Sequence, residues 1–252
     1  MTNKLRYFIV NWKMFGDFSS YKIVHKINSY TGTLNRSKKS KVVLCVPSTL
    51  IHFFTKNLKK TAICIGAQNF HQEESPGPFT GGVSARMLKK MGAEYIILGH
   101  SENRSDGESF QLIKKKILSA LNQNLNIIFC VGETLADKKK GKTFSVIKNQ
   151  IRKSLDKKFN KKKIILAYEP VWSIGTNKIP NEKDLNKITR FIKIYYKKIF
   201  KTKNFPKVLY GGSVNNKNIS LLSSIDQIDG FLIGGASQSS KKFIDIIKKY
   251  YK

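Results

Sequence analysis

The chain has 252 residues, of which 40% are hydrophobic and 25% are charged. This hydrophobic content supports a sizeable core and excludes a disordered polypeptide. No apolar run approaches the roughly 18 residues needed to cross a bilayer. Residues 1–13 hold only one short apolar stretch, Tyr7-Phe8-Ile9-Val10, which is too short for the core of a signal peptide. We therefore expect a cytoplasmic protein with no membrane partner.

The formal net charge is +31, from 47 Lys and Arg against 16 Asp and Glu. Such a balance normally indicates a polyanionic partner such as nucleic acid. Only six of the basic residues are Arg, the preferred side chain for forked contacts to phosphates and bases. Lys is instead spread over nearly every predicted helix, together with many Asn and Ile. We interpret this as compositional drift of a solvated surface. We expect no specific nucleic-acid partner, and attachment to polyanions through Lys stays a secondary alternative.

The three cysteines, Cys45, Cys64 and Cys130, are odd in number and far apart, and each lies in or beside an apolar run. This pattern is typical of small buried hydrophobes in a reducing compartment. It predicts neither a disulfide framework nor a zinc site.

Short apolar runs recur along the chain, and each is followed by a longer polar segment. The runs are continuous instead of alternating, as in parallel strands that are covered on both faces. In chain order, the predicted strands are Tyr7–Trp12, Val42–Val46, Ala62–Ala67, Tyr95–Leu98, Ile127–Val131, Ile164–Tyr168, Val208–Tyr210 and Phe231–Ile233.

The segments between the strands show apolar residues three or four positions apart, which predicts helices with one core-facing stripe. Three such stripes are Ile23, Ile27, Tyr30 and Leu34; Leu185, Ile188, Ile192 and Tyr195; and Phe243, Ile246, Ile247 and Tyr250. Eight strand–helix units in about 250 residues is the spacing of a (β/α)8 barrel. No linker divides residues 1–252, which indicates a single domain. A doubly wound sheet would usually carry Gly-x-Gly-x-x-Gly after the first strand, where this chain reads Asn11-Trp12-Lys13-Met14-Phe15-Gly16.

Polar residues and glycines follow the predicted strands, and in a barrel these strand ends meet at one face, where active sites lie. Each has an ordinary structural reading by itself, as a surface cation, a half-buried ring or a turn. Together they place a Lys, a His and a Glu over one opening, with Gly-rich turns in positions that commonly hold phosphate. In chain order they are Asn11 and Lys13, Gln68-Asn69, Gly99-His100-Ser101-Glu102, Gly132-Glu133, Glu169, Gly211-Gly212-Ser213 and Gly234-Gly235.

The most informative of these residues is Glu169, at the end of the apolar run Ile164-Ile165-Leu166-Ala167. Pro170 stops the strand, and a small Gly-containing loop follows. A single carboxylate at the tip of an apolar strand is a candidate general base, and the loop has the composition of a lid. Ion-pairing Glu residues at strand ends are also common, so this residue alone leaves a structural role open.

In sequence order, the motifs of the whole chain resemble those of the triosephosphate isomerase family. The resemblance implies a single-domain TIM barrel that acts as a homodimer in glycolysis and gluconeogenesis. It rests on Asn11-Trp12-Lys13-Met14, Ile65-Gly66-Ala67-Gln68-Asn69, Gly99-His100-Ser101-Glu102, Cys130-Val131-Gly132-Glu133-Thr134-Leu135, Ala167-Tyr168-Glu169-Pro170-Val171-Trp172, Ile174-Gly175-Thr176, Tyr210-Gly211-Gly212-Ser213-Val214 and Asp229-Gly230-Phe231-Leu232-Ile233-Gly234-Gly235-Ala236-Ser237.

The resemblance implies interconversion of dihydroxyacetone phosphate and D-glyceraldehyde 3-phosphate through an enediol, with no metal and no cofactor. Glu169 would move the proton between adjacent carbons. Lys13, His100 and Asn11 would polarise the carbonyl and stabilise charge on the oxygens. Members of this family are the standard example of a Glu base paired with a neutral His near a helix N-terminus. Glu102 would hold Lys13 or its surroundings in place.

The substrate phosphate would lie on backbone N–H groups of Gly175, Ser213, Gly234 and Gly235. Residues 171–178, called the lid below, would close over the substrate and keep the enediol from losing its phosphate. The predicted lid residues other than Gly175 are Val171, Trp172, Ser173, Ile174, Thr176, Asn177 and Lys178.

Three departures from the family pattern concern the lid and the dimer. Asn177 stands where relatives have Gly, and Asn tolerates positive φ better than most residues. The segment His71 to Phe79 is one residue longer than usual, in the loop after the third strand, which in this family inserts into the partner subunit. Gly82 and Asn103 replace an acid and a base, so we expect a looser dimer that has lost an intersubunit ion pair. The predicted interface residues are Gln68, Asn69 and Thr80.

Two other functions were weighed. A metal-dependent sugar-phosphate epimerase would need His and Asp ligands at several strand ends, and only one of the four His residues, His100, follows a strand. A catalytically dead barrel kept for binding would show erosion at Lys13, His100 or Glu169, and all three residues are present.

Overall fold

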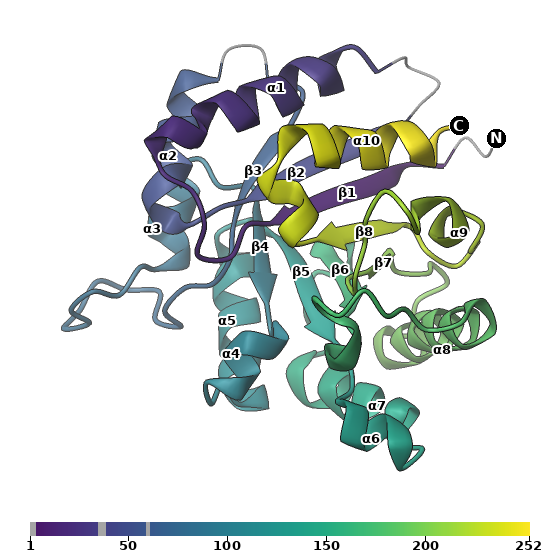
Figure 1. Ribbon diagram of the computed structural model, residues 1–252. Helices are drawn as coiled ribbons and strands as arrows, with labels where there is room; N and C mark the ends of the chain where they lie inside the picture. The colour runs from purple at the N-terminus through teal and green to yellow at the C-terminus, as the bar shows by residue number, and fades with distance from the viewer. Residues whose placement is uncertain (1–3, 35–38, 59–60) are drawn as a thin grey trace.

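The computed structural model describes residues 4–34, 39–58 and 61–252, and its strands form one closed, parallel barrel in the order β1 to β8 (Figure 1). This confirms the predicted (β/α)8 fold. The predicted domain limits include residues 1–3, which lie outside the described residues. The strands are β1 Arg6–Asn11, β2 Ser40–Cys45, β3 Cys64–Ala67, β4 Tyr95–Leu98, β5 Asn126–Val131, β6 Ile164–Tyr168, β7 Val208–Tyr210 and β8 Gly230–Ile233.

Each strand leads into at least one helix, and these helices surround the barrel (Figure 1). The connections after β4 and β5 each hold two. The α-helices are α1 Tyr21–Gly32, α2 Ser48–Asn57, α3 Ala85–Lys90, α4 Ser101–Ser105, α5 Phe110–Asn122, α6 Leu135–Lys139, α7 Thr143–Ser154, α8 Glu182–Phe200, α9 Ile219–Ser223 and α10 Ser240–Tyr250.

The predicted strand ends are wrong by one or two residues at several places, although every predicted strand is present. The first strand begins at Arg6 and ends at Asn11, because the chain turns at Lys13, which has a φ of 56°. Trp12 therefore lies just outside the strand, fully buried, and its indole Nε1–H donates to the carbonyl of Ser237 at 3.1 Å. Ala62 and Ile63 precede β3.

The buried side chains form two layers. One layer lies between the strands and the helices, and the other fills the barrel interior. Cys45, Cys64 and Cys130 belong to the interior layer and are free and buried, so their predicted role as small hydrophobes is confirmed. Parallel strands alternate their side chains between these two layers, which explains why their sequences are continuously apolar.

The predicted apolar stripes of the helices face the core, but one predicted residue is wrong. In α8, Leu185, Ile188 and Ile192 are buried, but the next buried ring is Tyr196, whereas Tyr195 is only partly buried. The stripes of α1 and α10 are buried at Ile27 and at Phe243, Ile246 and Ile247; their other predicted members are half-buried.

At the N-terminal end of the barrel, the carboxylate of Asp229 is 1% exposed and joins several elements. Its oxygens lie 2.8 Å from Lys4 Nζ and 2.8 Å from Lys193 Nζ, and one accepts from the Val208 N–H at 2.9 Å. Burial acts to raise the pKa of Asp229, but these bonds outweigh it and the pKa lies below its ordinary value. This cluster fixes the starts of β7 and β8.

No helix in the described part of the chain is long and apolar enough to cross a membrane.

Gly230 provides a test of barrel closure. A Cβ at this position would lie 2.1 Å from the carbonyl oxygen of Tyr7 on β1, so Gly230→Ala must push β8 away from β1. We expect a loss of about 3 kcal/mol in the free energy of unfolding, measured by urea denaturation. The control is Gly32→Ala, where the added Cβ would meet only the Cβ of Ala62 at 3.8 Å. Equal stability of the two variants would contradict the account.

Candidate active site

A cavity of about 220 Å³ lies at the C-terminal ends of the strands. It brings together all eight residues predicted for catalysis and phosphate binding, of which Gly175 belongs to the lid, and two further lid residues, Ile174 and Asn177. The predicted lining residues are Asn11, Lys13, His100, Glu169, Gly175, Ser213, Gly234 and Gly235. Gly211, Gly212, Val214, Asn215, Leu232 and Ala236 complete the wall.

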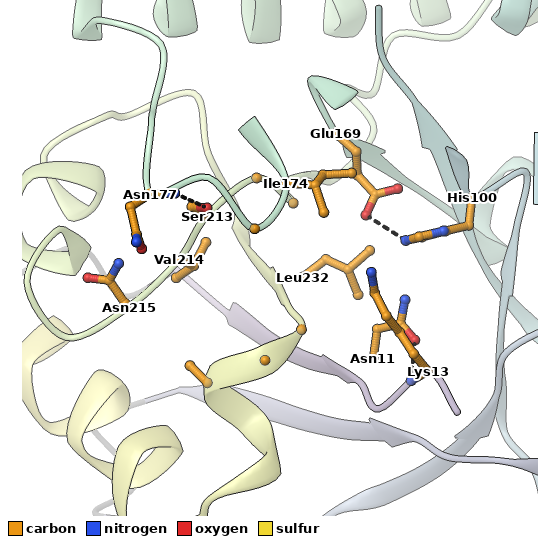
Figure 2. Close-up of a pocket in the computed structure, with 16 residues that line it drawn as sticks. Asn11, Lys13, His100, Glu169, Ile174, Asn177, Ser213, Val214, Asn215 and Leu232 are labelled. Atoms are coloured by element: carbon orange, nitrogen blue, oxygen red, sulfur yellow. Dashed lines mark hydrogen bonds and ion pairs between the residues drawn. The ribbon is translucent and has the colours of Figure 1, made fainter. Parts of the chain in front are cut away.

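Glu169 points into this cavity from the end of β6, opposite the ring of His100 (Figure 2). It is 4% exposed, and its Oε2 atom is buried without a hydrogen-bond partner. Its Oε1 atom lies 3.5 Å from His100 Nε2. A buried carboxylate oxygen with no donor is costly for the folded state, so this side chain does not contribute to stability through that atom.

The pKa of Glu169 is raised above its ordinary value, mainly because burial disfavours the ionised carboxylate. His100, the thiol of Cys130 and Lys13 act in the opposite direction, and Glu102 adds to the increase. A carboxylate whose pKa is shifted towards neutrality is a stronger base than an exposed one.

His100 is the N-cap of α4, and its Nδ1 atom accepts a hydrogen bond from the backbone N–H of Glu102 at 3.2 Å. An accepting Nδ1 carries no proton, so the neutral ring has its hydrogen on Nε2. Nε2 faces the cavity beside Glu169 (Figure 2). The ring is therefore oriented to donate a hydrogen bond to an oxygen in the cavity.

Lys13 reaches the cavity from a strained backbone, with a φ of 56° where few non-glycine residues occur. The side chain of Asn11 supports this turn, because its Oδ1 accepts from the Lys13 N–H at 3.1 Å. Lys13 Nζ forms an ion pair with Glu102 Oε1. The structure thus places Glu102 against both Lys13 and His100, as a support for the two side chains.

The lid begins with a short 3₁₀ turn, Val171–Ser173, and Ile174, Gly175 and Asn177 further along it line the cavity. Asn177 adopts a φ of 59°, the left-handed conformation that Asn was expected to tolerate here. Its N–H donates to Ser213 Oγ at 3.1 Å (Figure 2). The main chain of the lid is thereby hydrogen-bonded to the turn after β7.

The sequence did not reveal three residues that support the site. Glu133, 1% exposed, accepts from Trp172 Nε1 at 2.9 Å and from the Tyr168 hydroxyl at 3.2 Å, which anchors the first part of the lid. Arg104 donates to the carbonyls of Gly99 and Cys130, and Gln150 bonds both backbone groups of Gly132. Of the three, only Glu133 closely follows a strand, whereas Arg104 and Gln150 lie in α4 and α7, and no local pattern specifies their partners.

The residues predicted for a subunit interface lie away from the cavity. Asn69 Oδ1 accepts from Lys116 Nζ at 2.9 Å, Gln68 donates to the Cys45 carbonyl at 3.1 Å, and Thr80 is exposed. The segment between β3 and α3 extends away from the barrel (Figure 1). A Cβ at Gly82 would lie 2.9 Å from the Phe79 carbonyl oxygen, so this loop is shaped around a glycine.

In the described part of the chain, no group of three or more His, Cys, Asp and Glu side chains is arranged to hold a metal ion.

Comparisons with known proteins agree with this geometry. The family model of triosephosphate isomerase matches residues 6–250. A triosephosphate isomerase from Dictyoglomus thermophilum is 39% identical over 243 residues, covering 94% of this chain and 96% of the relative. One from Zygosaccharomyces bailii is 39% identical over 241 residues, covering 94% and 95%. The crystal structure of a triosephosphate isomerase from Bartonella henselae superposes with a TM-score of 0.89 at 34% identity, covering 98% of this chain and 99% of that chain.

The barrel and the Glu–His–Lys cavity at its C-terminal end thus define a barrel enzyme. The matches extend over nearly the whole length of both partners at 34% to 39% identity. The chain belongs to the triosephosphate isomerase family.

The raised pKa of Glu169 has a consequence for stability. A folded-state pKa above the unfolded value means that the folded protein binds the proton more tightly, so ionisation of Glu169 destabilises it. This cost is absent below the unfolded pKa and fully present once pH exceeds the folded pKa. Glu169→Gln should therefore raise the free energy of unfolding by about 1 kcal/mol at neutral pH.

Urea denaturation of wild type and Glu169→Gln across pH measures this difference. The gain should shrink as pH falls through the folded pKa of Glu169. A variant that is less stable than wild type at neutral pH would contradict the proposed cost of the buried carboxylate.

Proposed function

We propose that this chain interconverts dihydroxyacetone phosphate and D-glyceraldehyde 3-phosphate, with Glu169 as the base. The observation that carries the proposal is the buried carboxylate of Glu169, whose Oε2 has no hydrogen-bond partner, 3.5 Å from the Nε2 of a neutral His100. A triose phosphate has an acidic C–H bond next to a carbonyl group. Glu169 can accept the proton of that bond, and His100 can donate a hydrogen bond to the carbonyl oxygen. The names of the relatives support the same substrates.

In this mechanism, Glu169 removes a proton from the carbon next to the carbonyl. The electron pair of that C–H bond moves to the carbonyl oxygen, which gives an enediolate. His100 Nε2–H donates to the two substrate oxygens, while the Lys13 ammonium and the Asn11 amide stabilise the developing negative charge. A proton must also move from the hydroxyl oxygen on one carbon to the oxyanion on the other, and His100, which faces the cavity with Nε2–H, would donate its proton to the oxyanion and take up the hydroxyl proton in exchange. Return of the proton from Glu169 to the neighbouring carbon then completes the isomerisation, with every proton accounted for.

The phosphate of the substrate would lie against the backbone of Gly175, Ser213, Gly234 and Gly235. A Cβ at Gly175 or Gly235 would meet nothing within 4 Å, which indicates open space on that side of each backbone. A phosphate can therefore approach the main-chain N–H groups closely. Lys13, which also lines this cavity, adds a positive charge.

Gly211 leaves room for the side chain of the proposed base, Glu169. A Cβ there would lie 2.6 Å from Glu169 Cγ, so the missing side chain gives the Glu169 side chain its space. Gly132 has a similar role behind the strand, where a Cβ would lie 1.9 Å from the Glu169 carbonyl oxygen. These contacts support a base held by close packing against glycine backbone.

We further propose that the protein acts as a homodimer in the cytoplasm and serves glycolysis and gluconeogenesis. The loop after β3, which extends away from the barrel, supports a subunit contact through Gln68, Asn69 and Thr80 (Figure 1). The family to which the chain belongs supports the pathway.

The first test is isomerisation of D-glyceraldehyde 3-phosphate in phosphate-free buffer. Replacement of the base in Glu169→Ala should reduce kcat about 10²- to 10⁴-fold, because proton transfer loses its positioned acceptor. A matched control is Glu182→Gln, which removes a carboxylate at the exposed start of α8 and should keep wild-type activity. An inactive, folded wild-type protein would instead favour a barrel retained for binding.

The second test concerns the dimer. With a net charge of +31 on each chain, two subunits repel each other at low salt. We expect the dissociation constant to fall as the ionic strength rises from about 0.05 M to about 0.5 M, because screening removes this repulsion. Sedimentation velocity at several protein concentrations measures it. A dimer that weakens with added salt would indicate that intersubunit ion pairs dominate.

A further inference from the structure

The hydroxyl of Ser173 occupies an unusual place in the lid. Ser173 is 0% exposed, whereas Gly175, Thr176 and Asn177 further along the lid are exposed. It ends the 3₁₀ turn that starts the lid, and its N–H donates to the Pro170 carbonyl at 2.8 Å. A buried hydroxyl in an otherwise open loop requires partners, because a buried polar group without hydrogen bonds is costly.

The Ser173 hydroxyl uses its complete hydrogen-bonding capacity. Its Oγ–H donates to the Lys178 carbonyl at 2.5 Å, so its one proton is committed. The Tyr210 hydroxyl, 2.9 Å away, must then donate to Ser173 Oγ, and the backbone N–H of Ser213 donates to the same atom at 3.4 Å. One donated and two accepted bonds are all that a serine hydroxyl can form.

These three partners join separate segments. Lys178 is the last residue of the lid, so its bond to Ser173 closes the lid on itself. Tyr210 ends β7 and Ser213 follows it, so their bonds hold the lid against the turn beside the cavity. The Ser213 hydroxyl adds a bond to the Ser173 carbonyl at 2.7 Å.

The turn after β7 is shaped around this contact. A Cβ at Gly212 would lie 2.2 Å from the Tyr210 hydroxyl and 2.5 Å from Ser173 Oγ, so no side chain fits there. Thr176 provides a contrast. Its hydroxyl donates only to the carbonyls of Trp172 and Ser173, and so shapes the lid without joining it to β7.

We propose that Ser173 is a positioning residue whose hydroxyl is the catch that holds the lid down over the cavity. The inference rests on the proposed isomerase function for its kinetic consequences, but the catch itself is a property of the fold. Opening the lid must break the bonds to Tyr210 and Ser213, while the bond to Lys178 lets the lid move as one body. Removing the hydroxyl leaves the Tyr210 phenol, the Ser213 N–H and the Lys178 carbonyl without this partner.

The kinetic test compares Ser173→Ala with Ser154→Ala. Ser154 ends α7, is equally buried at 0% exposed, and its hydroxyl has no hydrogen-bond partner. Ser173→Ala should raise KM for D-glyceraldehyde 3-phosphate about two- to tenfold, as expected for loss of one net hydrogen bond. It should also raise the release of inorganic phosphate per isomerisation, because an open lid exposes the enediolate to loss of its phosphate. Ser154→Ala should change neither quantity.

A second pair of measurements separates this inference from the proposed function. Amide hydrogen exchange of the free protein should speed up at Ser213 and across residues 174–178 in Ser173→Ala, but not in Ser154→Ala. Tyr210→Phe removes only the phenol oxygen and should reproduce part of the effect. In a double-mutant cycle, the two changes should be less than additive.

The outcomes are distinguishable. If the wild-type protein does not isomerise triose phosphates, the proposed function fails, while hydrogen exchange still tests the catch. If Ser173→Ala matches Ser154→Ala in exchange, in KM and in phosphate release, the catch is overturned. Fully additive effects of Ser173→Ala and Tyr210→Phe would also overturn it, because the two hydroxyls would then act independently.

Discussion

The site depends on one electrostatic constraint: a carboxylate, that of Glu169, is held in the barrel mouth where it is neither solvated nor fully hydrogen-bonded. Burial makes it more basic, and the neighbouring groups are arranged accordingly. His100 faces it as a neutral donor because its other nitrogen is occupied by the N-terminus of α4. Lys13 supplies charge without pairing directly with Glu169, because Glu102 engages its ammonium group. The cavity therefore holds both a basic carboxylate, Glu169, and hydrogen-bond donors, His100 and Lys13, that remain available to a substrate.

A chain with 16 acidic residues against 47 basic ones buries several of its carboxylates. Asp229 is surrounded by lysines, Glu108 pairs with Lys116, and Glu133 accepts from Tyr168 and Trp172. These carboxylates hold strands, helices and lid in place, although one oxygen of Glu108, Oε2, is buried without a hydrogen-bond partner. Glu169 differs in the group that faces it, because its Oε1 lies 3.5 Å from the Nε2 of a histidine, His100. The small number of Asp and Glu residues therefore concerns mainly the surface, whereas the interior keeps the carboxylates that the barrel and its site require.

Much of the fold and the position of the site could be predicted from the sequence, because continuous apolar runs mark buried parallel strands and their last residues converge by topology. The polarity of a strand end does not tell which partner it meets. The anchoring of Trp172 by Glu133 and the three bonds of Ser173 are contacts between loops far apart in the chain, and no local pattern encodes them. The left-handed backbone of Lys13 was likewise invisible, because local propensity disfavours it.

In the proposed mechanism, Glu169 transfers a proton between adjacent carbons of a triose phosphate. This proton transfer is tested most directly by following D-glyceraldehyde 3-phosphate by proton NMR in D₂O, with wild type and Glu169→Gln. A proton held on a carboxylate exchanges with solvent, so the account predicts deuterium on the carbon next to the carbonyl of the product in wild type. It predicts no such incorporation above the uncatalysed rate in the variant. Isomerisation by Glu169→Gln at the wild-type rate, with deuterium in the product, would show that another group is the base.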